Sequence, residues 1–382
     1  MTLSEPQPKP SASPSSTSDM RAGTIRYAVI GTGMMGREHM RNIALLEGAE
    51  ITALADPNAD SLAQAAAGGR AGLAQYRDHR DLLSAGGFDC VVIASPNDTH
   101  AAVLADVLAA QKPVLVEKPL CATLDDCRAI LRLAEKAEAP AWVAMEYRYM
   151  PPVERLIDKV RAGEAGRLKM IAIREHRFPF LQKIDDWNRF SVRTGGTLVE
   201  KCCHFFDLMR FMAGAEARRV YASGAMDVNF VGETYGGRPA DILDNAFVVV
   251  EFDNGVRAML DLCMFAEGAY WQEQIAATGD LASIEAFVPG PARFSPDGRE
   301  RMSELVVSPR ATKQPVREEI HVDPVILAAG DHHGSTFFQH QKFLDMVRHG
   351  GTPEVTLEDG MRAVMIGQAA EESARTGSAI AL

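Results

Sequence analysis

The chain has 382 residues, of which 47% are hydrophobic and 24% charged, so it is long enough for two globular domains. Its net charge of −11 excludes a general nucleic-acid-binding protein, because such a protein needs a concentrated basic surface. The six cysteines form no C-x-x-C pair, the N-terminus has no signal segment, and no apolar run approaches the roughly 20 residues of a membrane-spanning helix. We therefore expect a reduced, cytoplasmic protein with no membrane or nucleic-acid partner.

Residues 1–23 are rich in proline and serine, which predicts a disordered tail. Beyond the tail, short apolar runs alternate with helical segments; the runs are 25–31, 50–56, 89–95, 112–119 and 141–147. Strands that are apolar throughout and alternate with helices indicate a doubly wound parallel sheet covered on both faces. Ligands of such sheets bind beyond the carboxyl ends of the strands.

The first run leads into G-T-G-M-M-G (31–36), which opens the following helix. In this position Gly31 permits a tight turn, Gly33 lets the backbone approach a pyrophosphate, and Gly36 allows close packing of helix on strand. Glycine triplets occur by chance, but strand, glycines and helix follow in the order that dinucleotide binding requires. We therefore predict a Rossmann domain over residues 24–150, with Met34 and Met35 also at the cofactor.

Asp56 ends the second run, twenty residues beyond Gly36. A carboxylate at this place accepts hydrogen bonds from both adenosine ribose hydroxyls and repels a 2′-phosphate, so the predicted cofactor is NAD rather than NADP. The alternative is an ordinary glycine turn with Asp56 capping a loop.

The third and fourth runs also end in polar residues, from which we expect further cofactor contacts: Ser95, Asn97, His100, Glu117 and Lys118. Lys118 precedes a proline that fixes the direction of the chain. It is either a functional lysine or a solvated lysine at a strand end.

After about Pro151 strand-like runs follow one another, and Asp253-Asn254-Gly255 indicates a hairpin between two of them. We predict an α+β domain over residues 151–382 with a large open, mostly antiparallel sheet, one face of which needs a cover of helices or another subunit. The predicted helices are 152–163, 198–213 and 357–375, and the last could pack back on either domain.

Polar residues are concentrated in GGTLVEKCCHFFDLM (195–209). In a helix, Glu200, His204 and Asp207 share one face. Cys203 and His204 are adjacent, so they point about 100° apart, and no second ligand cluster accompanies them; we predict no metal site and a buried thiol rather than a nucleophile. Beside a dinucleotide, a histidine oriented by a carboxylate suits the base that takes a hydroxyl proton as hydride leaves carbon.

In their order and spacing AVIGTGMMG, the aspartate of ALADP, SPNDTH, VEKP, RYMP and GGTLVEKCCHFFD resemble the glucose–fructose oxidoreductase / inositol dehydrogenase / rhizopine-catabolism (Gfo/Idh/MocA) family. The resemblance covers nearly the whole chain beyond the tail. It implies NAD(P)-dependent oxidoreduction of sugars or polyols, and homodimers or homotetramers. It also implies that Lys118 contacts cofactor ribose and substrate hydroxyl, and that His204 is the general base. Glu200 stands where many members have aspartate, so it either contacts substrate or orients His204.

The leading predicted function is NAD-dependent oxidation of a hydroxyl of a sugar, polyol or sugar derivative. The second is a glycosidase, a reaction found among relatives, that oxidises a ring hydroxyl with retained NAD, eliminates the aglycone, adds water and returns the hydride. The third, a non-catalytic NAD-binding protein, would leave Lys118, Glu200 and His204 without a purpose.

Basic residues gather in segments that we expect to flank the pocket: Arg148, Arg174, His176, Arg177, Lys183, Arg189 and Lys201. If several converge on the ligand, the substrate carries a carboxylate, phosphate or sulfonate. The alternative is that they are solvated or paired with Glu146, Asp185 and Asp186. The predicted substrate-binding residues are Lys118, Arg148, Tyr149, His176, Lys183, Glu200, Lys201 and His204. We interpret the histidine-rich segment 330–343 as a substrate-lining or dimer-contact loop rather than a metal site.

Overall fold

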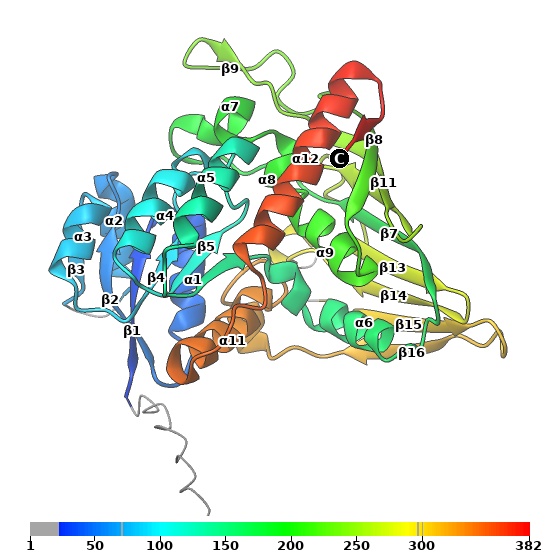
Figure 1. The fold of residues 1–382 in the computed structure, drawn as a ribbon, viewed down its shortest axis with the longest axis horizontal. Helices are drawn as coiled ribbons and strands as arrows, with labels where there is room; N and C mark the ends of the chain where they lie inside the picture. Colours follow the sequence, from blue (N-terminus) through cyan, green and yellow to red (C-terminus); the bar gives the residue numbers. More distant parts are fainter. Residues whose placement is uncertain (1–22, 70–71, 296–297, 300) are drawn as a thin grey trace, which may run out of the picture.

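The computed structural model describes residues 23–69, 72–295, 298–299 and 301–382, which form two main sheets (Figure 1). Apart from Gly23, the tail predicted over residues 1–23 lies outside the described residues. No helix of the described part is long and apolar enough to cross a membrane.

The first sheet has six parallel strands in the order β3-β2-β1-β4-β5-β6, as predicted for a doubly wound fold. Its strands are β1 Ile25–Ile30, β2 Ala49–Ala55, β3 Ala74–Tyr76, β4 Cys90–Ile93, β5 Val114–Glu117 and β6 Ala141–Ala144. The intervening helices are α1 Met34–Ile43, α2 Ala59–Ala67, α3 His79–Ala85, α4 His100–Ala109 and α5 Leu124–Ala134. The strand order reverses between β1 and β4, which places a ligand crevice at the loops that follow these strands.

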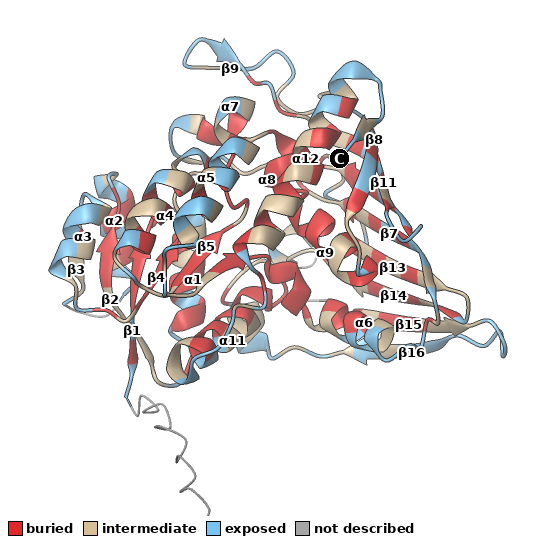
Figure 2. Ribbon diagram, in the orientation of Figure 1, coloured by how far each residue is buried: buried red, intermediate tan, exposed pale blue. Residues whose placement is uncertain are grey.

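Both faces of this sheet are covered, since every residue of β4 and β5 is buried (Figure 2). The sequence missed β3, which has only three residues and no fully buried side chain.

The second sheet has nine strands among the described residues, in the order β16-β15-β14-β13-β7-β12-β11-β8-β17. They are β7 Leu168–His176, β8 Ala217–Ala225, β11 Asn245–Phe252, β12 Arg257–Cys263, β13 Glu273–Gly279, β14 Ala282–Val288, β15 Ser303–Pro309, β16 Val316–Ile320 and β17 Ile380–Ala381. All neighbouring pairs are antiparallel except β7 with β12, which confirms the predicted mixed, mostly antiparallel sheet. A small separate hairpin joins β9 Thr234–Tyr235 to β10 Arg238–Pro239.

Helices cover one face of the second sheet. They include α6 Pro151–Arg161, which contacts β13 to β15, α9 Cys203–Ala213, which contacts β7, and α12 Leu357–Thr376, which contacts β8. Alternate residues of β11 are exposed, so the opposite face carries no helix. The remaining short helices are α7 Ser191–Thr194, α8 Thr197–Glu200 and α10 Pro324–Leu327, and the longer α11 is Ser335–His349.

The long helix α12 joins the two halves of the molecule (Figure 1), because it contacts α5 and β6 of the first as well as α8, α9 and β8 of the second. Its N-terminus has a capping box between Thr356 and Asp359. Gly360 and Gly367 lie at the contacts: an added Cβ would be 2.9 Å from a methyl of Val143 and 2.7 Å from the carbonyl oxygen of Leu198, respectively. These two glycines let the helix approach both halves closely.

Candidate active site

The glycine loop after β1 leaves room for a ligand at its middle glycine. Gly31 has a φ of 89°, and a Cβ there would be 2.5 Å from backbone atoms that follow β4. A Cβ on Gly36 would be 2.0 Å from the Gly31 carbonyl oxygen, whereas none of the described atoms lies within 4 Å of a Cβ on Gly33. Gly33 also starts α1 without a side-chain cap, so the N–H groups of Met34 and Met35 face an open cradle that fits a pyrophosphate.

Asp56 is tied to this loop and is only 8% exposed. Its Oδ2 accepts hydrogen bonds from the amide (2.7 Å) and hydroxyl (3.1 Å) of Thr32, and its Oδ1 accepts one from the Asn58 amide (2.8 Å). A carboxylate has about four acceptor positions, so one remains for a ribose hydroxyl, whereas the predicted contact to both hydroxyls needs two.

The loops after β4 and β5 brace one another. Asn97 donates to the carbonyl of Thr194 (3.3 Å), and the two ring nitrogens of buried His100 lie 2.8 Å from the carbonyl oxygen of Pro119 and 2.9 Å from that of Ser95. Both polar edges of His100 are therefore engaged with backbone. This corrects the expectation that His100 contacts the cofactor: it positions the two loops instead.

Both carboxylate oxygens of Glu117 make their contacts within the protein. Its Oε1 lies 2.8 Å from Nε2 of His39, and its Oε2 accepts the Lys118 amide at 3.1 Å. Burial would raise the pKa of Glu117, but the hydrogen bond to His39 holds it below the usual value. Glu117 is thus an ionised group that fixes the start of the Lys118 turn, not the direct cofactor contact expected from the sequence.

The predicted single helix 198–213 is two helices, α8 and α9, separated at Lys201 and Cys202. The carbonyl of Glu200 at this break accepts a hydrogen bond from Lys118 Nζ (3.1 Å), which joins the first half of the molecule to the second. Burial alone would lower the pKa of Lys118, but nearby Cys203, Glu117 and Glu200 raise it. Lys118 is therefore an ammonium, and one acceptor leaves two of its three N–H groups for ligands.

His204 is 1% exposed, and neither ring nitrogen has a hydrogen-bond partner among the described residues. Its ring stacks on Tyr147 with centroids 4.2 Å apart and an interplanar angle of 5°. Burial, followed by the charges of Lys118 and Lys201, holds the pKa of His204 well below 6.5. The imidazole is therefore neutral and free to accept a proton.

Tyr147 is in turn fixed by charged groups. Lys201 Nζ donates to the Tyr147 hydroxyl (2.8 Å) and lies 2.8 Å from Glu175 Oε1, while the tyrosine hydroxyl donates to Glu273 (3.4 Å). Burial and the charge of Glu175 raise the pKa of Glu273 to about 7. Lys201 thus holds the Tyr147 ring on which His204 stacks, a role that the sequence did not reveal.

Neither Glu200 nor Asp207, which were expected on the same helix face as His204, makes a hydrogen bond to it. Glu200 Oε1 pairs with Lys183 Nζ (3.2 Å), while Oε2 is buried without a partner among the described residues. Asp207 receives both Nε and Nη2 of Arg148 at 2.6 Å. The orientation of His204 comes from the Tyr147 stack instead.

The neighbouring thiols are buried, as expected, and burial raises their pKa: well above the usual value for Cys202 and to about 12 for Cys203. Neither supplies a thiolate at neutral pH. Among the described residues, no group of three His, Cys, Asp or Glu side chains is arranged to hold a metal ion.

Two family models match this chain. The NAD-binding Rossmann fold of the Gfo/Idh/MocA oxidoreductase family matches residues 25–145, and the C-terminal alpha/beta domain of the same family matches residues 157–382. The chain belongs to the Gfo/Idh/MocA oxidoreductase family. NAD is the cofactor of its first domain, and the cradle at Gly33 together with Asp56 fits it.

Individual relatives share only about a quarter of their aligned residues with this chain. The rhizopine catabolism protein MocA of Rhizobium meliloti is 28% identical over 275 residues, 72% of this chain and 80% of that protein. The myo-inositol 2-dehydrogenase of Thermotoga maritima is 26% identical over 351 residues, 91% of this chain and 96% of that protein. A levoglucosan dehydrogenase structure with NADH and levoglucosan has a TM-score of 0.77 at 20% identity, covering 94% of this chain and 99% of its own; this likeness concerns the fold alone.

Three of the predicted substrate-binding residues contact side chains other than His204. Arg148 is buried in its pair with Asp207, and Tyr149 is buried beside Trp142, 6.2 Å between ring centroids. His176 pairs with Asp261 (3.1 Å) on the face of the second sheet opposite the helices. The alternation of β7 decides this, because it places buried Glu175 toward α9 and His176 on the other face.

The remaining predicted cations differ in their partners. Arg174 bonds to His176 and shares its face, whereas Arg177 lies 3.5 Å from Glu175 on the side of His204. Arg189 is 4% exposed and stacks over Phe230, and none of the described carboxylates pairs with it. Pairing with Glu146, Asp185 and Asp186 was expected as the alternative and does not occur in the described residues.

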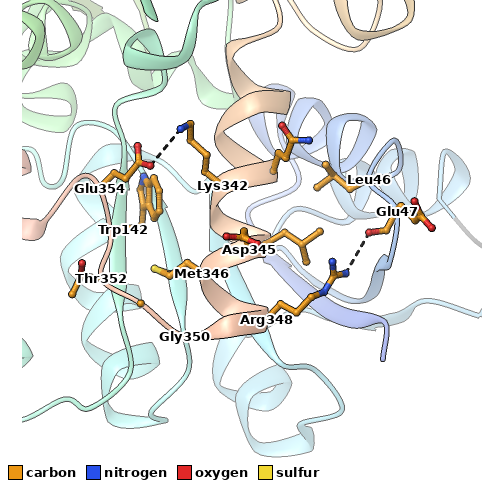
Figure 3. A pocket seen from close by; sticks show the side chains of 13 residues that line it. Leu46, Glu47, Trp142, Lys342, Asp345, Met346, Arg348, Gly350, Thr352 and Glu354 are labelled. Atoms are coloured by element: carbon orange, nitrogen blue, oxygen red, sulfur yellow. Dashed lines mark hydrogen bonds and ion pairs between the residues drawn. The ribbon is translucent and has the colours of Figure 1, made fainter. Parts of the chain in front are cut away.

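A surface pocket of about 620 Å³ lies between α11 and the residues Leu46 and Glu47, which follow α1. Figure 3 shows the side chains that line it. Its cations are already engaged: Lys342 is 3.4 Å from Glu354, and Arg348 donates to the Glu47 carbonyl at 3.4 Å. None of its lining residues belongs to the glycine loop or to α8 and α9, so it is not part of the candidate active site.

Proposed function

We propose that this protein oxidises a hydroxyl of a sugar, polyol or sugar derivative with NAD. The observation that supports it most directly is the neutral, unpartnered imidazole of His204 beside the Lys118 ammonium at the edge of an NAD-binding sheet. Relatives named as inositol dehydrogenases support this substrate class.

In the proposed reaction the substrate hydroxyl lies between Lys118 and His204. His204 accepts the hydroxyl proton, and Lys118 donates a hydrogen bond to the same oxygen as negative charge develops there. Bound NAD supplies the hydride acceptor. The C–H and O–H bonds break, a carbonyl forms, and the proton remains on His204 until it is released.

We further propose that the substrate carries an anionic group. After burial, the charges of Lys118, Lys201, His332 and Arg177 lower the pKa of His204, so four cationic side chains lie near this imidazole. Buried Arg189, without a carboxylate partner among the described residues, is a second candidate contact for a carboxylate, phosphate or sulfonate.

A panel of neutral sugars, sugar acids and their glycosides, incubated with NAD, tests these proposals. Formation of NADH with a sugar acid is the expected result, and a preference for neutral sugars would contradict the anionic proposal. Release of aglycone without NADH, with deuterium from heavy water entering the sugar, would favour the glycosidase. NADH without deuterium incorporation identifies the dehydrogenase.

We also propose a homodimer or homotetramer formed through the uncovered face of the second sheet. This face carries exposed Met170, Tyr221, Phe247, Val249 and Met259 on neighbouring strands, and Phe247 is 62% exposed. Exposed apolar patches of this kind are typical of protein interfaces.

A further inference from the structure

His332 lies between α10 and α11 and is held by carboxylates from two other segments. Its Nδ1 is 2.8 Å from Oε1 of Glu38 in α1 and 3.7 Å from Oε1 of Glu146. Thr336 Oγ1 lies 2.6 Å from Glu146 Oε2 and 3.3 Å from Glu38 Oε1, so it ties the two carboxylates together. A Cβ on Gly330 would be 2.3 Å from Glu38 Oε1, so the loop reaches this carboxylate because residue 330 is a glycine.

Two buried carboxylates beside one imidazole favour its protonated form. Burial would lower the pKa of His332, but Glu146 and Glu38 raise it to about 9. Without this cation both carboxylates would be buried with little compensation, which is costly. His332 therefore supplies positive charge to the cluster, together with His39 and Arg41 near Glu38.

The cluster adjoins the groups proposed to carry the chemistry. The His332 ring centroid is 6.2 Å from that of Tyr147, on which His204 stacks. The charge of His332 contributes to the low pKa of His204 and to that of Glu117, next to Lys118. The side chain of His332 is 21% exposed while that of Glu146 is fully buried, so an edge of the imidazole is accessible.

We propose that His332 is an active-site imidazolium that binds the substrate, with Nδ1 held by Glu38 and the Nε2–H donating to a substrate oxygen other than the one oxidised. This inference rests on the proposed function and narrows it to sugars or polyols with a second hydroxyl or a carboxylate near the reacting carbon. A hydrogen bond to a charged donor corresponds to about a 10- to 150-fold effect on binding.

Two amide substitutions of His332 separate the contribution of Nδ1 from that of Nε2. In His332→Asn the amide nitrogen takes the place of Nδ1, so the contact to Glu38 is kept and the distal donor is lost. In His332→Gln the amide nitrogen takes the place of Nε2, so the distal donor is kept. The control is His349→Asn, since the exposed His349 pairs with Asp345 at the same 2.8 Å but lies near the end of α11.

Steady-state kinetics are measured with the panel substrate of highest kcat/KM, and NAD binding by fluorescence titration. We expect His332→Asn to raise KM by about 10- to 150-fold with unchanged NAD affinity, and His332→Gln to recover most of this loss. An unchanged KM in His332→Asn would overturn the inference and leave the proposed function standing.

Side-chain NMR of ¹⁵N-histidine protein tests the imidazolium without any substrate. The signal lost in His332→Asn should report a protonated ring at about pH 8, where an ordinary imidazole is neutral. A neutral ring at this pH overturns the inference. If no panel compound yields NADH, the proposed function fails, and this measurement still decides the charge of His332.

Discussion

At the scale of single residues, the site depends on two neighbouring groups with opposite protonation. His204 is kept neutral by burial and surrounding cations, while Lys118 is kept charged by nearby acidic groups. A base and a hydrogen-bond donor of this kind can act on one hydroxyl without first exchanging protons with solvent.

His204→Ala and Lys118→Met should each lower kcat by about 10²- to 10⁴-fold, because each removes one participant in proton transfer. NAD affinity, measured by fluorescence titration, should change little for His204→Ala. A rate within a few-fold of the parent for His204→Ala would remove this residue from the role of base.

The pH profile tests the same assignment. The pKa of His204 lies well below 6.5, so the proton-accepting form persists as the pH is lowered to that value. We expect kcat to stay level over this range and to fall only at lower pH, as His204 becomes protonated. A fall in kcat centred near 6.5 would indicate an ordinary, solvated histidine.

Asp56 should control the choice of cofactor. Asp56→Asn keeps the shape of the side chain but removes the charge that repels a 2′-phosphate. We expect the ratio of kcat/KM for NAD over NADP to fall by about tenfold or more. If the unmodified protein has the same kcat/KM for NADP as for NAD, Asp56 does not discriminate against the 2′-phosphate.

At the scale of elements, the break between α8 and α9 is what makes the site. The Glu200 carbonyl at this break accepts the hydrogen bond from Lys118. The motif residues Lys118 and His204 could be located from the sequence because each stands in a local pattern: Lys118 follows a strand, and His204 lies in a polar helical segment. The break could not, because helical spacing continues through it.

The sequence indicated segment 330–343 as a substrate-lining or dimer-contact loop. It did not reveal the stack of Tyr147 on His204 or the contacts of His332 to Glu38 and Glu146, since these join distant parts of the chain. Glu38 and His332 are 294 residues apart, and no local pattern relates them. The overall fold was easier to predict, since the apolar runs of both sheets and the helices α6 and α12 each leave a local signal.

A substitution at Gly367 tests how closely α12 packs on α8. A Cβ there would be 2.7 Å from the carbonyl oxygen of Leu198. We expect Gly367→Ala to destabilise the protein by about 1–3 kcal/mol despite the higher helix propensity of alanine. Thermal unfolding measures this, with Gly268→Ala as control because none of the described atoms lies within 4 Å of its added Cβ. Equal melting temperatures would contradict the tight contact.

At the scale of the whole molecule, the proposed oligomer depends on the uncovered sheet face. Phe247→Glu places a charge in the centre of this apolar surface, so we expect dissociation to smaller species in light scattering. Val231→Glu is the control, because Val231 is similarly exposed but lies outside the sheet. A monomeric parent protein would refute the proposed oligomer.

The long helix α12 also sets when the enzyme can become active during synthesis. It leaves the ribosome well after α8, which rests against it. A nascent chain without α12 has every strand of the NAD-binding sheet, but it lacks Leu357 and Val364 of that domain's core as well as the support for α8 and α9. The docking of α12 therefore completes both domains together, and we expect a chain that terminates before residue 357 to bind cofactor less firmly as well as to lack turnover.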